Sequence, residues 1–203
     1  MYKKLHRHTR NISTIIIVLL FSTSLWQLAT ASWIQGKAII AQQLLNNAWK
    51  QTLADPDKTT TFINHKPWPW ADTWPVAKLI VPQYGIEQIV LAGDSGSSLA
   101  FAPGYSLSSA FPNTAGLTVI SAHRDTHFQF LHQVKINDEI CLQTADKTMR
   151  YKVYDLQVID SKTHSVQSDS NDKTLALVTC YPFNAIASGG SLRYVIFAHE
   201  HPL

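Results

Sequence analysis

Seven short apolar or alternating runs succeed one another between Val76 and Ala198, and this series most limits how the chain can fold. Turn residues separate the runs, among them Pro82, Gly93-Asp94 and Gly189-Gly190. Short strands at this spacing, without regular helices between them, are typical of a closed barrel or a sandwich. We therefore predict a mainly β fold of seven or eight strands, with a short helix near 128–131. The runs are residues 76–81, 86–91, 117–123, 138–143, 150–159, 174–180 and 192–198.

The N-terminus has the pattern of a membrane anchor. Four basic residues, Lys3, Lys4, Arg7 and Arg10, precede a stretch without charge that lasts until Lys37. A transmembrane helix needs roughly 20 mainly apolar residues. We therefore predict a signal-anchor over 11–34, with the basic tail 1–10 in the cytoplasm. A cleaved signal peptide ending near 29–31 is the alternative, and both interpretations place the rest of the chain outside the cytoplasm.

The charge balance of the chain argues against a nucleic-acid partner. The net charge is +3, from 17 basic and 14 acidic residues, and four of the basic ones lie in the N-terminal tail. The remainder is close to neutral, whereas phosphate binding needs Lys and Arg clustered on the folded surface. A charged share of 15% beside 45% hydrophobic residues also excludes an intrinsically disordered chain.

A spacer separates the predicted anchor from the strand-rich part. Apolar residues at spacings of three and four predict a helix over 37–53, which Asp55-Pro56 ends. The following Pro67-Trp68-Pro69-Trp70 excludes a regular helix and indicates a linker, or a strap lying over the fold. The predicted domains are therefore a tail at 1–10, an anchor at 11–34, a spacer and linker at 35–72, and a strand-rich domain at 73–203.

Three segments carry residues suited to acyl-transfer chemistry. They are SAHRDTHF at 121–128, TCYPF at 179–183 and SLRYV at 191–195, each at the edge of a predicted strand. In such a set, the Cys180 thiol is a candidate nucleophile and the His123 imidazole its proton partner. Arg193 is a candidate to hold a substrate carbonyl or a developing oxyanion.

Each of these residues also has a purely structural interpretation. A cysteine in an apolar run is often a small core residue, and a Cys141–Cys180 disulfide would suit a non-catalytic, exported β-barrel adaptor. We instead expect Cys180 to be a free thiol and Cys141 to be a structural one that faces inward. A metal site is a weaker alternative, because Arg124 stands where the zinc-protease pattern between His123 and His127 requires Glu. The terminal His199-Glu200-His201 is a second, adventitious candidate for metal binding.

The three segments, in this order, resemble those of sortases, the membrane-anchored cysteine transpeptidases. The resemblance runs from about Val76 to the C-terminus, and the basic tail and anchor also fit it. The strings SAHRDTHF, TCYPF and SLRYVIFAHE are most similar to the short Gram-negative sortases, sometimes called class GN. Two positions depart from the family pattern. Ala176 stands where a Thr is common, and Tyr105 stands where the family often has a His.

The resemblance implies a sortase-like closed β-barrel with Cys180, His123 and Arg193 as catalytic residues. It further implies a substrate protein with a C-terminal sorting signal similar to LPxTG, cleaved through a Cys thioester and transferred to an amine acceptor. No cofactor and no metal are expected, and no acidic cluster suited to calcium is found in the sequence. The implied location is the inner membrane, with the catalytic domain in the periplasm. A cysteine hydrolase using the same three residues is the alternative enzyme.

Overall fold

The computed structural model describes residues 2–55, 65–166, 172–185 and 189–201. The chain divides into two compact units, residues 1–42 and residues 43–203. Helix α1 (Tyr2–Ala54) begins in the first unit and ends in the second, and all strands belong to the second. The strands are β1 (Pro75–Val81), β2 (Ile86–Ala92), β3 (Gly104–Tyr105), β4 (Gly116–Ser121), β5 (Glu139–Gln143), β6 (Thr148–Asp160), β7 (Lys173–Cys180) and β8 (Leu192–Glu200). The short helical elements are η1 (Pro82–Tyr84), α2 (Gly96–Leu99) and η2 (Gln129–Gln133).

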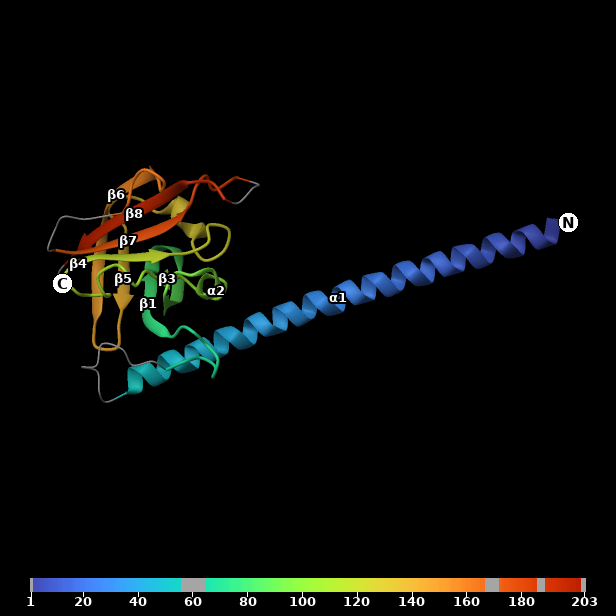
Figure 1. The fold of residues 1–203 in the computed structure, drawn as a ribbon, viewed down its shortest axis with the longest axis horizontal. Helices are drawn as coiled ribbons and strands as arrows, with labels where there is room; N and C mark the ends of the chain where they lie inside the picture. Colours follow the sequence, from blue (N-terminus) through green and yellow to red (C-terminus); the bar gives the residue numbers. More distant parts are fainter. Residues whose placement is uncertain (1, 56–64, 167–171, 186–188, 202–203) are drawn as a thin grey trace. The chain divides into compact units, whose positions relative to one another are not determined.

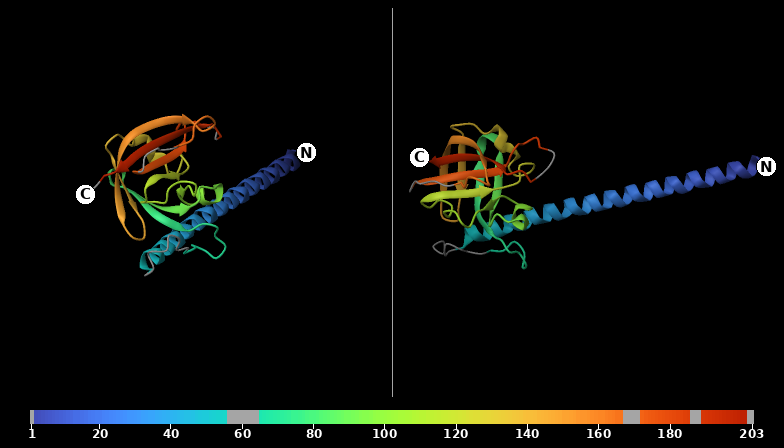
Figure 2. Two further views of the ribbon diagram at one scale, coloured as in Figure 1. Left: turned by 60° about the vertical axis from the view of Figure 1, so that its left-hand side comes forward. Right: turned by 45° about the horizontal axis from the view of Figure 1, so that its top comes forward.

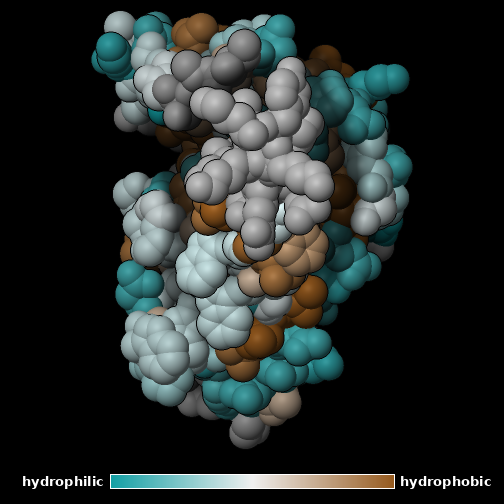
Figure 3. All heavy atoms as spheres, turned by 90° about the vertical axis from the view of Figure 1, so that its right-hand side faces the viewer, coloured by the Kyte–Doolittle hydropathy of each residue, from teal (hydrophilic) through white to brown (hydrophobic). Residues whose placement is uncertain are grey.

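The first unit consists of helix α1 up to residue 42, and the large apolar side chains from Ile15 to Ile40 are exposed. From Thr14 onward the helix is long and apolar enough to cross a membrane. Figure 3 colours the residues of the molecule by hydropathy, with hydrophobic ones in brown. Hydroxyl groups inside it are satisfied locally, because Ser22 Oγ donates to the Val18 carbonyl at 2.8 Å. The helix continues through Gly36, so the predicted anchor and the predicted 37–53 helix form one element. The membrane boundaries at 11–34 stay a prediction.

The eight strands of the second unit form a closed barrel, which confirms the predicted fold class (Figures 1 and 2). Around the barrel the order is β1-β2-β3-β4-β7-β8-β6-β5. Most neighbours are antiparallel, but β2 pairs with β3, and β4 with β7, in parallel. The parallel pairing of β4 and β7 matters most for function, because both strands then end at the same side of the barrel.

The sequence pattern located seven of these strands and missed one. The missed strand, β3, has only two residues, too few to show any periodicity. The boundaries differ from the predicted ones by up to two residues, and β4 ends at Ser121 instead of His123. There the chain turns, and the His123 carbonyl accepts from the amides of Thr126 and Phe128 at 3.4 and 3.0 Å. The predicted short helix near 128–131 is the 3-10 helix η2.

Alternating side chains from all the long strands fill the barrel. In β7, for example, Leu175 and Leu177 lie in the core, whereas Ala176 and Val178 belong to a second apolar cluster on the outer face. Full burial of one such aliphatic side chain contributes about 1.5–3 kcal/mol. The largest fully buried side chains are Tyr151, Phe128, Leu79, Leu91, Ile120, Leu131, Ile140, Leu142, Leu175, Leu177 and Ile196, together with Leu45 of α1.

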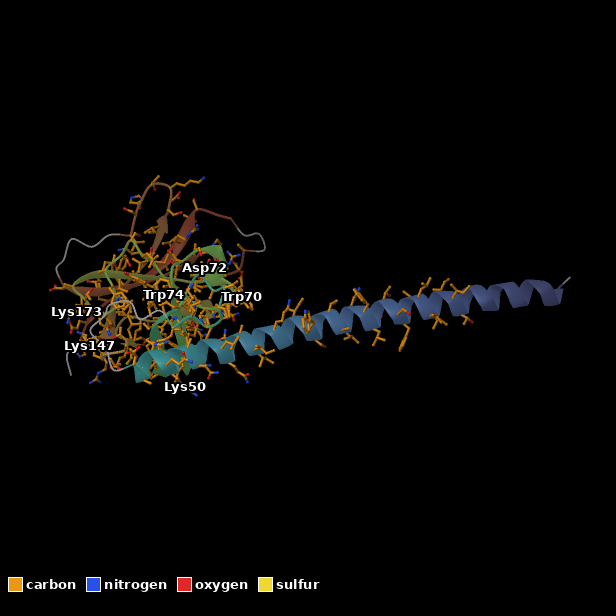
Figure 4. All side chains as sticks on the ribbon, turned by 60° about the horizontal axis from the view of Figure 1, so that its bottom comes forward. Lys50, Trp70, Asp72, Trp74, Lys147 and Lys173 are labelled. Atoms are coloured by element: carbon orange, nitrogen blue, oxygen red, sulfur yellow. The ribbon has the colours of Figure 1, made fainter. Side chains whose placement is uncertain are left out.

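Within the second unit, the end of α1 and the Pro/Trp segment both pack against the barrel. Leu45 and Trp49 form a separate cluster with residues of β2, and the Trp68 ring lies edge-on to Phe101 at 5.0 Å. Thr73 Oγ1 donates to the Ala92 carbonyl at 2.7 Å. The segment is therefore a strap attached beside β2, and Figure 4 labels Trp70, Asp72 and Trp74 along it.

Cys141 lies on the outer face of β5, so the prediction that it faces inward was wrong. Side chains alternate along a strand, and Ile140 and Leu142 are the buried ones. Cys141 shares its face with Glu139, whose Oε1 accepts from the thiol at 3.5 Å. Both cysteines are free thiols. Three strand-to-strand steps separate β5 from β7, roughly 14 Å at the usual spacing, which is too far for a disulfide.

Gly104 occupies the tightest backbone contact of the barrel's short strand. A Cβ atom at this position would lie 2.4 Å from the Gly93 carbonyl oxygen and 2.8 Å from the Asp94 Cα. Both neighbours are backbone atoms, so neither can swing aside. The absence of a side chain at Gly104 therefore allows β3 to bridge β2 and β4.

We predict that Gly104→Ala destabilises the protein by about 1–3 kcal/mol, the usual range for overpacking a filled site. Gly96→Ala is the matched control, because a Cβ atom there meets nothing within 4 Å. Chemical denaturation of both full-length variants in detergent gives the comparison. Equal unfolding midpoints for the two variants would contradict the packing argument.

Candidate active site

Three adjacent strands bring the predicted site residues to one end of the barrel. β4 runs parallel to β7, and its last pair joins Ser121 to Val178. β7 runs antiparallel to β8, and its last pair joins Cys180 to Arg193. The end of β7 and the start of β8 therefore lie beside the end of β4.

Strand alternation places Cys180 on the outer face of the barrel. Val178, two residues earlier, belongs to the outer apolar cluster, whereas Leu177 lies in the core. Arg193 stands directly opposite Cys180 in the register, where side chains on one face have Cβ atoms about 4.5–5.5 Å apart. The thiol and the guanidinium stem therefore emerge side by side, and both residues are partly exposed.

His123 lies just beyond the end of β4, next to the same position. The Ala122 amide donates to the Val178 carbonyl at 3.2 Å. In the opposite direction, the Oγ1 atom of buried Thr179 donates a hydrogen bond to the Ala122 carbonyl at 2.8 Å. These two bonds extend the pairing of β4 and β7 by one residue and bring exposed His123 level with Cys180 along the sheet.

The Arg193 guanidinium hydrogen-bonds to backbone carbonyls at and just before the start of β8. Its Nη1 donates to the Gly190 carbonyl at 2.7 Å and to the Leu192 carbonyl at 2.9 Å. One nitrogen of the fork is therefore held against the loop between β7 and β8. A planar guanidinium held at one nitrogen keeps its other donors in a fixed plane, which suits it to orient a substrate oxygen.

An open cavity of about 540 Å³ lies on the outer face, with Arg193 in its lining. Its floor is formed by outward residues of β4 and β7, and its wall by the segment that follows β6. This size falls in the range of about 300–1,000 Å³ usual for ligand pockets. The lining residues are Val119, Ser121, Ile159, Ser161, Lys162, Thr163, His164, Ser165, Val166, Val178 and Arg193.

His127 lies close enough to His123 to be influenced by its charge. Burial lowers the pKa of His127, and the positive charge of a protonated His123 lowers it further. The Gln88 Nε2 donates to the His127 carbonyl at 2.9 Å, which fixes this turn against β2.

The zinc-site alternative finds no matching arrangement in the described residues. Residues 124–128 form turns, so the helical spacing assumed for a zinc site at His123 and His127 does not occur. Within the described ranges, no three His, Cys, Asp or Glu side chains lie together as metal ligands.

Tyr105, which stands where the family often has a His, is buried, and its hydroxyl donates to the Ser109 carbonyl at 2.8 Å. A side chain at this position therefore points into the fold.

Two residues beside the site were missed by the sequence analysis. Thr179 links the ends of β4 and β7, and Arg124 is buried between the His123 turn and the loop after Cys180. Neither has a sequence signal of its own, because a Thr in a strand and an Arg beside an Asp are both common at surfaces. Only the strand order shows that they join the two segments that carry His123 and Cys180.

Comparisons with known proteins agree with the barrel fold. A curated relative, Sortase D of Bacillus subtilis (strain 168), is 27% identical over 120 residues, which is 59% of this chain and 60% of that protein. A Clostridium perfringens sortase D5 transpeptidase superposes with a TM-score of 0.64 at 21% identity, over 80% of this chain and 99% of that one. Sortase A from Corynebacterium diphtheriae gives 0.57 at 22% identity, over 80% and 85% of the two chains.

The family model is the most specific of these findings. The sortase domain model matches residues 79–201, which include all three predicted catalytic residues. The resemblance to the Gram-negative class stays a prediction, since the relatives named above carry class A and class D names. Because the matched region exceeds half of the chain, the protein belongs to the sortase family.

Proposed function

We propose that this protein is a membrane-anchored cysteine transpeptidase that acts on a C-terminal sorting signal similar to LPxTG. The observation that carries the proposal is the register at the ends of β4, β7 and β8. It sets Cys180 opposite Arg193 and brings His123 level with both, beside an open cavity. Membership of a family of cysteine transpeptidases supports the same reaction.

The cavity is the proposed site for the sorting signal. Its floor is apolar at Val119 and Val178, which suits the Leu and Pro side chains of such a peptide. Arg193 lies among its lining residues, so a peptide in the cavity runs toward the nucleophile. An extended peptide on this outer face would present its scissile carbonyl between Cys180 and Arg193.

In the first step, the Cys180 thiolate attacks the peptide carbonyl carbon. The carbonyl electrons move to oxygen, and the Arg193 guanidinium stabilises the resulting oxyanion. The C–N bond then breaks, and the departing amine takes a proton from protonated His123. The products are a thioester on Cys180, a free amine and a neutral His123.

In the second step, an acceptor amine attacks the thioester carbon. Neutral His123 removes the proton that the amine loses, and Arg193 again stabilises the oxyanion. The C–S bond breaks and the Cys180 thiolate is restored, so the cycle needs no cofactor. The carboxyl group ends in a new amide bond.

The proposed location is the inner membrane, with the catalytic domain in the periplasm. The apolar α1 provides one candidate span near the N-terminus. The four basic residues before it favour a cytoplasmic N-terminus by the positive-inside rule.

We predict that the full-length protein in detergent transfers an LPxTG-like peptide to a small primary amine. With excess amine, the amide product should exceed the free acid, because the acceptor competes with water for the thioester. Cys180→Ala should abolish both products, whereas Cys141→Ala should retain both because Cys141 lies on β5. If added amine leaves the product ratio unchanged, the protein is a hydrolase instead.

We predict that Arg193→Lys lowers kcat/KM by at least about 100-fold, the usual cost of one lost oxyanion donor, ~2.7–4 kcal/mol. A lysine that keeps the Gly190 contact has no second nitrogen for the substrate. Steady-state kinetics measures the loss, and circular dichroism confirms that the variant is folded. A loss below about tenfold, ~1.4 kcal/mol, would remove Arg193 from the catalytic set.

We predict that stability decreases as the pH falls below about 6.5, the ordinary His pKa, in part because of His127. Its folded pKa is lowered, so the unfolded chain binds the proton more readily and protonation favours unfolding. His127→Gln should flatten the decrease in unfolding free energy between about pH 7 and 5. His201→Gln, at an exposed position, serves as the control, and an equal slope in the two variants would refute the assignment.

A further inference from the structure

Arg124 is a buried guanidinium between two segments of the active site. Its side chain is only 6% exposed. Nη1 donates to the Pro182 carbonyl at 2.7 Å, and Nη2 donates to the Ala185 carbonyl at 2.7 Å. Nε donates to Asp125 Oδ1 at 3.2 Å, and that carboxylate is 70% exposed. The two short bonds therefore connect the turn after His123 to the loop after Cys180.

Burying an arginine is costly unless its donors find acceptors, since charged groups lose their hydration. Here the planar fork meets two backbone carbonyls of a single turn, which also contains the bond from the Ala185 amide to the Pro182 carbonyl at 3.3 Å. A fork that binds two fixed acceptors at once sets orientation as well as distance. An arrangement of this kind is specific to arginine and is poorly reproduced by lysine.

The position of Arg124 extends the pairing between the two catalytic strands. The register of β4 with β7 ends at Ser121 and Val178, and the Ala122 bonds add one more residue. His123 and Cys180 lie beyond these bonds. The Arg124 contacts come next along the chain, so residues 123 and 180 lie between the strand ladder and the Arg124 fork in their two segments.

We propose that Arg124 is a positioning residue that sets the spacing between His123 and Cys180 by holding the turn at residues 182–185. It touches neither the substrate nor the reacting atoms. Its effect is to keep the imidazole and the thiol at the separation that proton transfer to the leaving amine requires. This inference rests on the proposed transpeptidase function.

The first test is kinetic, on the full-length protein in detergent. Arg124→Ala should lower kcat by up to about 100-fold, the cost of a misplacement of about 1 Å. KM for the peptide should stay within about threefold, because the cavity residues are unchanged. Arg124→Lys should recover only part of the lost kcat, since an ammonium meets one carbonyl at a time.

Chemical rescue separates this role from general loss of structure. Guanidinium chloride at low millimolar concentration should restore part of the kcat of Arg124→Ala, whereas ammonium chloride at the same ionic strength should not. Arg150→Ala is the matched control, because Arg150 is on β6 and its contact to Glu139 is partly exposed at 3.8 Å. That variant should keep wild-type kcat and show no response to guanidinium.

A second measurement does not depend on activity. Hydrogen exchange should be faster in Arg124→Ala at the Tyr181 and Ala185 amides, which bond to the Leu192 and Pro182 carbonyls at 3.1 and 3.3 Å. Exchange within β1 and β2 should be unchanged. Faster exchange in Arg124→Ala, combined with a wild type that transfers no peptide, would refute the proposed function while leaving the Arg124 contact intact. Wild-type kcat in Arg124→Ala, or unchanged exchange at the two amides, would overturn the positioning role.

Discussion

The parallel pairing of β4 with β7 is the constraint on which the site depends. Antiparallel neighbours would send the end of one strand to the start of the other, and His123 would then lie at the opposite end of the barrel from Cys180. The parallel register instead ends both strands at one rim. A parallel connection needs a long crossover, and the chain between β4 and β7 supplies it with η2, β5 and β6. The hairpin of β7 and β8 then brings Arg193 to the same rim.

Closure of the sheet makes this arrangement rigid. Every long strand has a neighbour on each side, so none presents an open edge. The inward residues form one core, while the outward residues of β4, β7 and β8 form a separate apolar cluster with Val166. The outer face therefore has a packed apolar cluster of its own, and this cluster gives the cavity next to Arg193 a fixed floor. Such a floor suits a site that must hold an extended peptide in one register.

Much of the fold followed from local sequence patterns, but the arrangement of the strands did not. Alternation located the seven longer strands, whereas β3 was too short to have a pattern. The inward assignment of Cys141 failed because the burial of a strand face depends on its neighbours, and only Ile140 and Leu142 face the core. The three motif residues were chosen from the sequence, yet their proximity depends on strand order, which carries no local signal. For the same reason Arg124 was missed: its acceptors lie about sixty positions away, in the 182–185 turn.

The central claim is that Cys180 becomes acylated by the sorting signal, and trapping that thioester tests it most directly. Full-length protein in detergent is mixed with an LPxTG-like peptide, quenched in acid without added amine, and digested for mass spectrometry. The account predicts that the peptide's acyl fragment is attached to the segment containing Cys180 and is released by hydroxylamine, with Cys141 unmodified. Cleavage of the peptide without any adduct on Cys180, or an adduct on Cys141 instead, would contradict it.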